Sequence, residues 1–155
     1  MFATTIFAQL GIVALVGALA LALWKGDSAE RLGGGINLAA GLFAMFLHPL
    51  LSPDVQPVAQ LVVDAALAAG FLFLSIRFAS LWLGVAMLLQ AVQFSLHAYY
   101  MVGDLKHDHL FAEINNVDSW GIIFCIIVGT AVSWRQRVVK RRREAQKAAV
   151  GAPSA

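Results

Sequence analysis

The chain has 155 residues, of which 60% are hydrophobic and 13% charged, whereas an ordinary soluble domain is about 45–50% apolar and about 25% charged. A chain this short has too little interior to hide so much apolar surface, so the composition excludes a soluble globular domain and predicts an integral membrane protein. The net charge is only +2, but the charges are strongly segregated along the chain. The single cysteine, Cys125, excludes an intrachain disulfide.

Five apolar segments are long enough to be membrane-spanning helices, because crossing about 30 Å of hydrocarbon takes about 20 apolar residues. Backbone groups in lipid must be paired within each segment, so each one is expected to be a helix. Short connections between them predict an up-and-down bundle, with 1–134 forming a single all-α membrane domain. The expected helices are about 5–24, 34–51, 57–76, 80–102 and 117–134.

The ends of the first three segments are marked by charge, glycine and proline. The first segment is interpreted as a retained membrane helix rather than a signal peptide, because the first basic residue of the chain is Lys25. The glycines at 33–35 are interpreted as a flexible entry to the second segment, which Pro49 and Pro53 close. The third segment opens with Pro57, where the missing N–H costs nothing.

If the chain crosses the membrane five times, nearly all of its Lys and Arg residues lie on the same side. Positive charge favours the cytoplasmic side, so the sequence predicts an N-terminus outside and a basic C-terminal tail in the cytoplasm of a bacterial inner membrane. The outer side carries Lys106 among five acids, Asp54, Asp104, Asp108, Glu113 and Asp118. The inner side holds the other ten of the eleven basic residues: Lys25, Arg31, Arg77, Arg135, Arg137, Lys140, Arg141, Arg142, Arg143 and Lys147.

The basic tail, residues 135–155, is expected to continue the last helix for a few turns and then to be disordered. Its cations are expected to contact anionic lipid head groups, at about 1 kcal/mol each near the surface. No aromatic residues are interleaved with these charges, so the sequence predicts no nucleic-acid binding.

Polar side chains interrupt three of the segments, and an ionisable group in hydrocarbon is costly unless it has a partner. On the fourth segment the polar positions are spaced i, i+3, i+7, i+10, which places them on one face of a helix. The candidates are Gln90, Gln93, His97 and Tyr100 on the fourth segment, Gln60 and Asp64 on the third, and His48 on the second.

Their depths in the membrane are compatible. At the helical rise per residue, Asp64 lies about 10 Å below the outer surface, His97 about 8 Å and His48 about 6 Å. The third and fourth segments are hairpin neighbours, so Asp64 is expected to contact His97 or Gln93. The sequence therefore predicts a polar cluster in the outer half of the membrane, made of His48, Gln60, Asp64, Gln93 and His97.

Three interpretations of this cluster stay open. The primary one is a structural lock between helices, which needs no cofactor. The second is a quinone head-group site, where His and Asp exchange protons and Phe94, Tyr99 and Tyr100 line the walls. The third is b-type haem held by His48 and His97, with room for the macrocycle beside Gly41 and Ala44.

The long connection at 103–118 contains His107 and His109, a weak candidate for a zinc or copper site. A solvated acidic loop is the preferred interpretation, with a short interfacial helix around Leu110, Phe111 and Ile114. Six aromatic residues near the segment ends are expected to be interfacial anchors: Trp24, Trp82, Trp134, Tyr99, Tyr100 and Trp120.

Catalytic motifs are missing from the sequence: it contains no Walker motif, dinucleotide fingerprint, CxxC or nucleophile elbow, so an enzyme is not expected. The primary functional prediction is a non-catalytic membrane subunit that packs against other subunits or a second copy, in a complex handling electrons or protons. Small residues at 65–70 would allow such close packing. The alternatives are a quinone-binding or b-haem electron-transfer protein and, less favoured, a proton- or cation-coupled transporter using Asp64.

Overall fold

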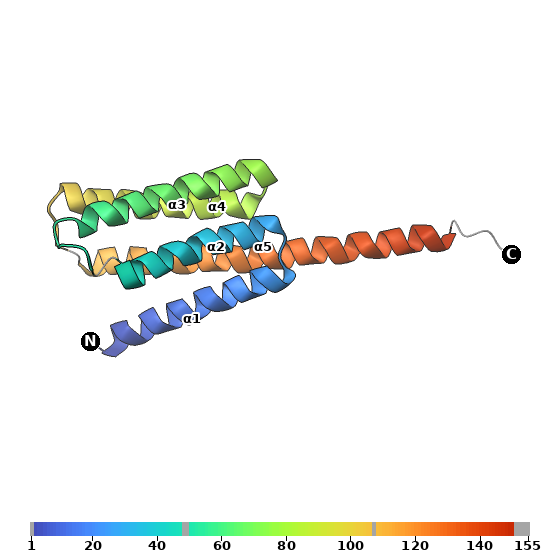
Figure 1. Ribbon diagram of the computed structural model, residues 1–155, viewed down its shortest axis with the longest axis horizontal. Helices are drawn as coiled ribbons and strands as arrows, with labels where there is room; N and C mark the ends of the chain where they lie inside the picture. The colour runs from blue at the N-terminus through green and yellow to red at the C-terminus, as the bar shows by residue number, and fades with distance from the viewer. Residues whose placement is uncertain (1, 48–49, 107, 151–155) are drawn as a thin grey trace.

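The computed structural model describes residues 2–47, 50–106 and 108–150. The expected all-α class with five helices is confirmed within these ranges. The helices run alternately up and down along one long axis (Figure 1). Helix α2 continues into a turn of π-helix, η1 (Phe43–Leu47). The five helices are α1 (Phe2–Lys25), α2 (Ser28–Leu42), α3 (Gln56–Phe78), α4 (Leu81–Val102) and α5 (His109–Val150).

Three helices are long and apolar enough to cross a membrane. They are α3, α4 and the His109–Lys147 part of α5, with mean hydropathies of 1.9, 1.4 and 1.6 over their most apolar stretches. A shorter apolar stretch, Leu10–Lys25, forms most of α1. These three candidate spans indicate a multi-pass membrane protein.

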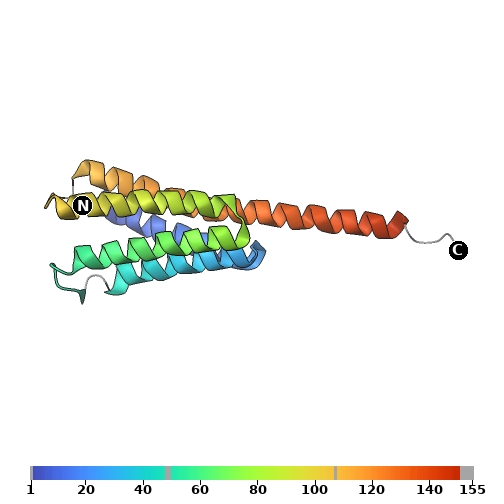
Figure 2. The same cartoon turned by 90° about the horizontal axis from the view of Figure 1, so that it is seen from above.

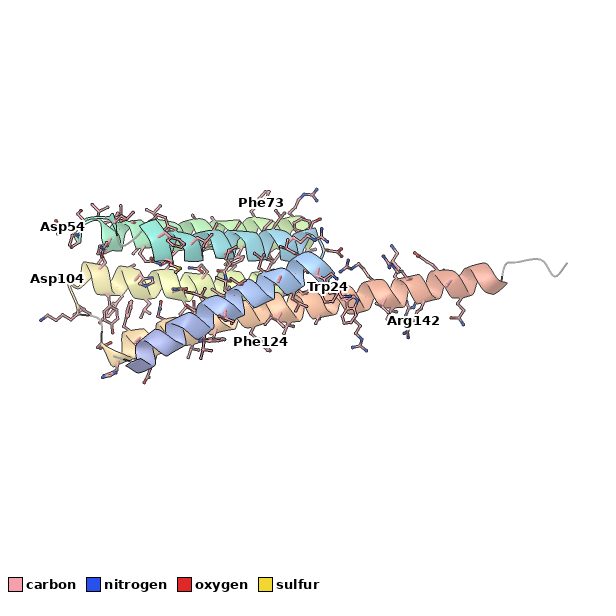
Figure 3. The ribbon with its side chains drawn as sticks, turned by 60° about the horizontal axis from the view of Figure 1, so that its bottom comes forward. Trp24, Asp54, Phe73, Asp104, Phe124 and Arg142 are labelled. Carbon is pink, nitrogen blue, oxygen red and sulfur yellow. The ribbon has the colours of Figure 1, made fainter. Side chains whose placement is uncertain are left out.

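The five helices close into a bundle. Each helix packs on its neighbours in the chain, and α1 packs on α5, so the first and last helices complete the ring. The C-terminal part of α5 projects beyond the other helices along the long axis (Figures 1 and 2). The acids Asp54 and Asp104 lie at one end of the bundle, while Trp24 lies toward the other and Arg142 lies on the projecting helix (Figure 3).

Apolar side chains fill the bundle and also cover its outside. Phe71, Leu83 and Ile126 are fully buried in the core. Phe73 and Phe124 are 66% and 65% exposed on the outer surface, as expected where the surroundings are hydrocarbon rather than water.

The second helix begins at Ser28, six residues before the predicted start. Its first turn is a capping box, in which the backbone N–H of Asp27 donates to the Glu30 carboxylate at 2.8 Å. The glycines at 33–35 therefore lie inside α2, and the prediction of a flexible entry is wrong. A Cβ on Gly33 would lie 2.8 Å from Trp82, so this glycine gives the indole room to pack closely.

The fifth helix begins at His109, eight residues before the predicted start. Asp108 caps it, since its carboxylate accepts a hydrogen bond from the backbone N–H of Phe111 at 2.9 Å. Leu110, Phe111 and Ile114 accordingly belong to α5, and a separate interfacial helix is not present among the described residues.

Two of the six expected aromatic anchors point inward. Trp82 packs between Gly33 and Gly129 and donates its indole N–H to Glu30 at 3.2 Å, while Tyr100 is 7% exposed. The other four aromatic residues are exposed: Trp24, Tyr99, Trp120 and Trp134.

Candidate functional site

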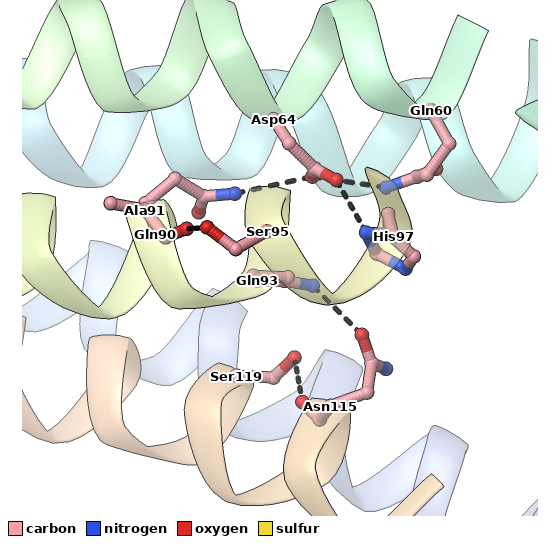
Figure 4. Close-up of polar contacts among 9 residues, drawn as sticks. All are labelled: Gln60, Asp64, Gln90, Ala91, Gln93, Ser95, His97, Asn115 and Ser119. Atoms are coloured by element: carbon pink, nitrogen blue, oxygen red, sulfur yellow. Dashed lines mark hydrogen bonds and ion pairs between the residues drawn. The ribbon is translucent and has the colours of Figure 1, made fainter. Parts of the chain in front are cut away.

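Asp64 is the centre of the polar cluster inside the bundle. It is 1% exposed, and it accepts hydrogen bonds from the amides of Gln60 and Gln90 at 3.2 and 3.1 Å. The Nδ1 atom of His97 lies 2.5 Å from the other carboxylate oxygen of Asp64 (Figure 4). Gln60 and Asp64 are one turn apart on α3, and Gln90 and His97 are two turns apart on α4, so helical periodicity aligns both pairs.

One proton joins His97 and Asp64 in the short contact between them. With the proton on Nδ1, Asp64 is a carboxylate that accepts three hydrogen bonds, and the second ring nitrogen, Nε2, is an acceptor in the neutral imidazole. With the proton on the carboxyl oxygen, the acid donates to Nδ1, and Nε2 carries a hydrogen and is a donor.

A second contact joins α4 to α5 beside this pair. The amide of Gln93 donates to the Asn115 side chain at 2.9 Å instead of reaching Asp64 (Figure 4). Phe111 lies 5.3 Å from the His97 ring, centroid to centroid, and 4.9 Å from the Tyr100 ring. The start of α5 therefore forms one wall of the cluster.

A hydrogen bond closes the acidic end of the site. The Tyr100 hydroxyl donates to the Asp108 carboxylate at 2.6 Å. This bond, together with the one from the backbone N–H of Phe111, lowers the pKa of Asp108 below its ordinary value of 3.8. Asp108 thus holds the end of α4 and the start of α5 together as a charged carboxylate.

The cluster opens onto a cavity of about 770 Å³ that all five helices line. This volume is within the range of small-molecule sites, about 300–1,000 Å³. The polar lining includes Asn37, Gln60, Asp64, Gln93, His97, Asn115 and Ser119. The apolar lining includes Ile12, Leu15, Val63, Leu67, Ile122 and Ile123.

Asp118 is an acid of the same region that the sequence did not assign to the cluster. It is 3% exposed, and its Oδ2 atom has no hydrogen-bond partner among the described residues. A helix predicted from His109 onward would have placed Asp118 on the inner face, three residues after Asn115.

The predicted contact between Asp64 and His97 is confirmed. Gln60 and Gln90 join it, and Tyr100 lines the cavity. Gly41 and Ala44, expected to leave room on the second helix, also line it. Tyr99 was expected to line a head-group site, but it is 66% exposed on the outside of α4 and is not in the cavity wall.

The histidines proposed as metal ligands are only partly described. His48 and His107 lie outside the described residues, so neither the paired axial ligands of a haem nor the loop site is tested. His109 is exposed at the start of α5. Within the described ranges, no group of three or more His, Cys, Asp or Glu side chains is arranged to hold a metal ion.

A separate polar cluster lies at the basic end of the bundle. Arg137 on α5 forms an ion pair with Asp27 at 3.2 Å and donates to the backbone carbonyl of Lys25. Ser133 donates to the same aspartate at 3.1 Å. These contacts fix α5 to the α1–α2 turn, and the sequence pattern did not reveal them because they join residues more than 100 positions apart.

The chain matches no protein-family model, no curated protein and no solved structure. The chemistry and geometry of the site are therefore the basis for a functional assignment.

Proposed function

We propose that this protein binds a small lipid-soluble molecule inside the membrane, with the polar head of the molecule against the Asp64–His97 pair. One observation carries the proposal: the buried pair faces a cavity of about 770 Å³ that is lined by both polar and apolar groups. Protein interiors are normally close-packed, so a structural lock alone would need no such volume.

The chemistry of the pair supports a ligand that exchanges hydrogen bonds or protons. Imidazole is the side chain that changes charge near neutral pH, and its side chain here is 13% exposed, against 2% for that of Asp64. A ligand in the cavity could therefore reach His97 while Asp64 stays covered. Quinone head groups fit this description, and so do other small molecules with a polar head.

We also propose that the protein crosses a bacterial inner membrane five times. The length of α1, 24 residues, and the continuous helix at 28–47 support two crossings in addition to the three apolar helices. Ten basic residues on one side support a cytoplasmic C-terminus and an outer, acidic end where the cavity lies.

The test is to purify the protein in mild detergent, extract it with organic solvent and identify the bound molecules by mass spectrometry. We expect the wild type to carry a lipid-soluble molecule that His97→Gln loses. Ser95→Ala is the matched control, because Ser95 lies on the exposed face of α4 and bonds only to the Ala91 carbonyl in the described contacts. Equal extracts from all three proteins would overturn the proposal.

A second candidate function is a membrane subunit, which one observation favours. Ala65, Ala66 and Ala69 lie on the outer surface of α3, where small side chains let another helix approach closely. We expect Ala66→Phe to release the protein from a larger assembly in a native gel, and the exposed Ala20→Phe on α1 to leave that assembly intact. Migration of the wild type as a free monomer would contradict this function.

A further inference from the structure

We propose that the site takes an uncharged oxygen head group in its carbonyl and hydroxyl forms alike, and that the carbonyl form is bound together with one proton. This inference rests on the proposed function, since it names the class of molecule that the same cavity takes. It follows from three features of the site: the second ring nitrogen of His97, the protons that the Asp64–His97 pair can hold, and the uncharged polar lining of the cavity.

The second ring nitrogen of His97, Nε2, is open to a ligand. Its Nδ1 atom lies 2.5 Å from Asp64, and Nε2 is turned away from that carboxylate (Figure 4). No group of the described residues forms a hydrogen bond with Nε2. The buried side-chain atoms without a partner in the described ranges are Asp118 Oδ2 and Arg137 Nε, so Nε2 is not one of them. It is therefore an uncovered and unpaired nitrogen on a side chain that lines the cavity.

The number of protons on the Asp64–His97 pair sets the role of Nε2. With one proton the pair is negatively charged, and Nε2 has a lone pair that accepts a hydrogen bond. With a second proton the pair is neutral overall, and Nε2 carries a hydrogen whichever atom holds the proton of the short contact. A hydroxyl group both donates and accepts, so it pairs with either state, whereas a carbonyl oxygen pairs only with the second. A carbonyl ligand that meets the pair with one proton therefore binds with uptake of another from water.

The lining of the cavity suits an uncharged head group. Among the described residues that line it none is Lys or Arg, so no cationic side chain there pairs with a carboxylate or a phosphate. The side chain of Asp64 is only 2% exposed behind its hydrogen-bond donors, so it is a poor partner for an ammonium group. Other polar side chains of the lining are amides, which both donate and accept hydrogen bonds, and they include Asn37, Gln93 and Asn115.

Few other titratable groups surround the pair. In the described part of the lining they are Tyr100, which donates to Asp108 at 2.6 Å, and Asp104, which lies at the acidic end of the bundle (Figure 3). Asp118 is buried in α5 and is not a lining residue. The described lining residues of α1 and α2 are all uncharged. A proton taken up with a ligand is therefore assigned to the Asp64–His97 pair, and a variant of Asp64 tests this assignment.

Calorimetric titration of the full chain in detergent tests the inference with two probes of the same skeleton, 4-phenyl-2-butanone and 4-phenyl-2-butanol. We expect the ketone to bind about tenfold more weakly at pH 9 than at pH 6, because the pair has then lost the hydrogen that the ketone accepts. The alcohol should change by less than about threefold, since it can donate to Nε2 instead. Titrations in buffers of different ionisation enthalpy should show proton uptake with the ketone only. These measurements use the wild type, so they do not depend on the folding of any variant.

Two aspartate variants then locate the proton. In Asp64→Asn, the amides of Gln60 and Gln90, which both donate to Oδ1, should hold the new amide oxygen there and turn its nitrogen toward His97. That nitrogen donates to Nδ1, so the ring keeps its hydrogen on Nε2 and the ketone should bind equally at both pH values. Asp64 would thus act as a positioning residue. Asp54→Asn is the matched control at an exposed site, and it should keep the pH dependence of the wild type.

The outcomes separate the two proposals. Ketone binding that does not change with pH, or an alcohol that changes as much as the ketone, would overturn the link to a proton and leave the binding function standing. A pH dependence that persists in Asp64→Asn would overturn the role of the pair. Binding of neither probe would overturn the class of head group, while the molecule extracted from the wild type decides the binding function separately.

Discussion

Asp64 shows how far single residues could be predicted from the sequence. Its contact with His97 followed from depth and hairpin pairing, because both quantities depend only on helical rise and segment ends. The partners on α5 did not follow. Gln93 bonds to Asn115, and Asn115 was expected in a loop because the polar first turns of α5 hide its beginning from a hydropathy pattern.

Removing the Asp64 carboxylate should destabilise the bundle strongly. Asp64→Ala leaves the imidazole of His97 and two amides without their hydrogen-bond partner, and each buried polar group left unsatisfied costs about 1–3 kcal/mol. The measurement is the free energy of unfolding in detergent at pH 7. Asp54→Ala, at an exposed position, should change it by less than about 0.5 kcal/mol, and an equally small loss at Asp64 would show that the pair is not structurally important.

The carboxyl group of Asp108 should titrate below its ordinary range. The hydrogen bond from Tyr100 and the backbone N–H of Phe111 favour the charged form, so the pKa in the folded protein lies below 3.8. The contact therefore stabilises the fold above the unfolded pKa and is lost as the pH falls through the lowered one. The carboxyl-carbon NMR shift measures this directly: Tyr100→Phe should raise the midpoint, and a wild-type midpoint at or above 3.8 would contradict the geometry.

At the scale of the helices, the sequence predicted how many helices there are and in which order better than it predicted the residues at which they begin. Apolar length alone identified five helices, whereas α2 and α5 begin in polar turns capped by Asp27 and Asp108. A capping signal consists of only a few polar residues. The glycines in α2 and the acids before α5 made the two N-terminal caps difficult to recognise in the sequence. The inward turn of Trp82 depends on glycines from two other helices, so no local pattern could reveal it.

The packing of Trp82 against Gly129 gives a prediction about α5. A Cβ at Gly129 would lie 2.5 Å from the indole nitrogen, so Gly129→Ala should force the ring to move and cost about 1–3 kcal/mol. Gly35→Ala is the control, because nothing lies within 4 Å of a Cβ there and alanine favours a helix by about 0.5–1 kcal/mol. Thermal unfolding in detergent should separate the two variants in opposite directions, and equal melting temperatures would mean that Trp82 is not held by α5.

At the scale of the whole molecule, the charges lie at the two ends of the bundle. The acids Asp54 and Asp104 lie at the end where the cavity is found, and α5 carries its basic residues beyond the other end (Figure 3). Lys147 lies about 20 Å beyond Trp134 along a straight helix, farther than the Debye length of about 8 Å at physiological salt. Lipid head groups at the end of the bundle would therefore interact with the first cations of the tail more than with the last ones.

The proposed orientation predicts where the tail can be cut. Trypsin cleaves after Lys and Arg, and Lys140, Arg141, Arg142 and Arg143 are exposed on the part of α5 that projects from the bundle. With a cytoplasmic C-terminus, trypsin should remove the tail in inverted membrane vesicles and leave the tail attached to α5 in right-side-out ones, where Lys106 is the exposed site. Arg137 should resist cleavage in both, because it is bound to Asp27 and the Lys25 carbonyl at the surface of the bundle. Loss of the tail only in right-side-out vesicles would reverse the orientation and place the cavity in the cytoplasmic half of the membrane.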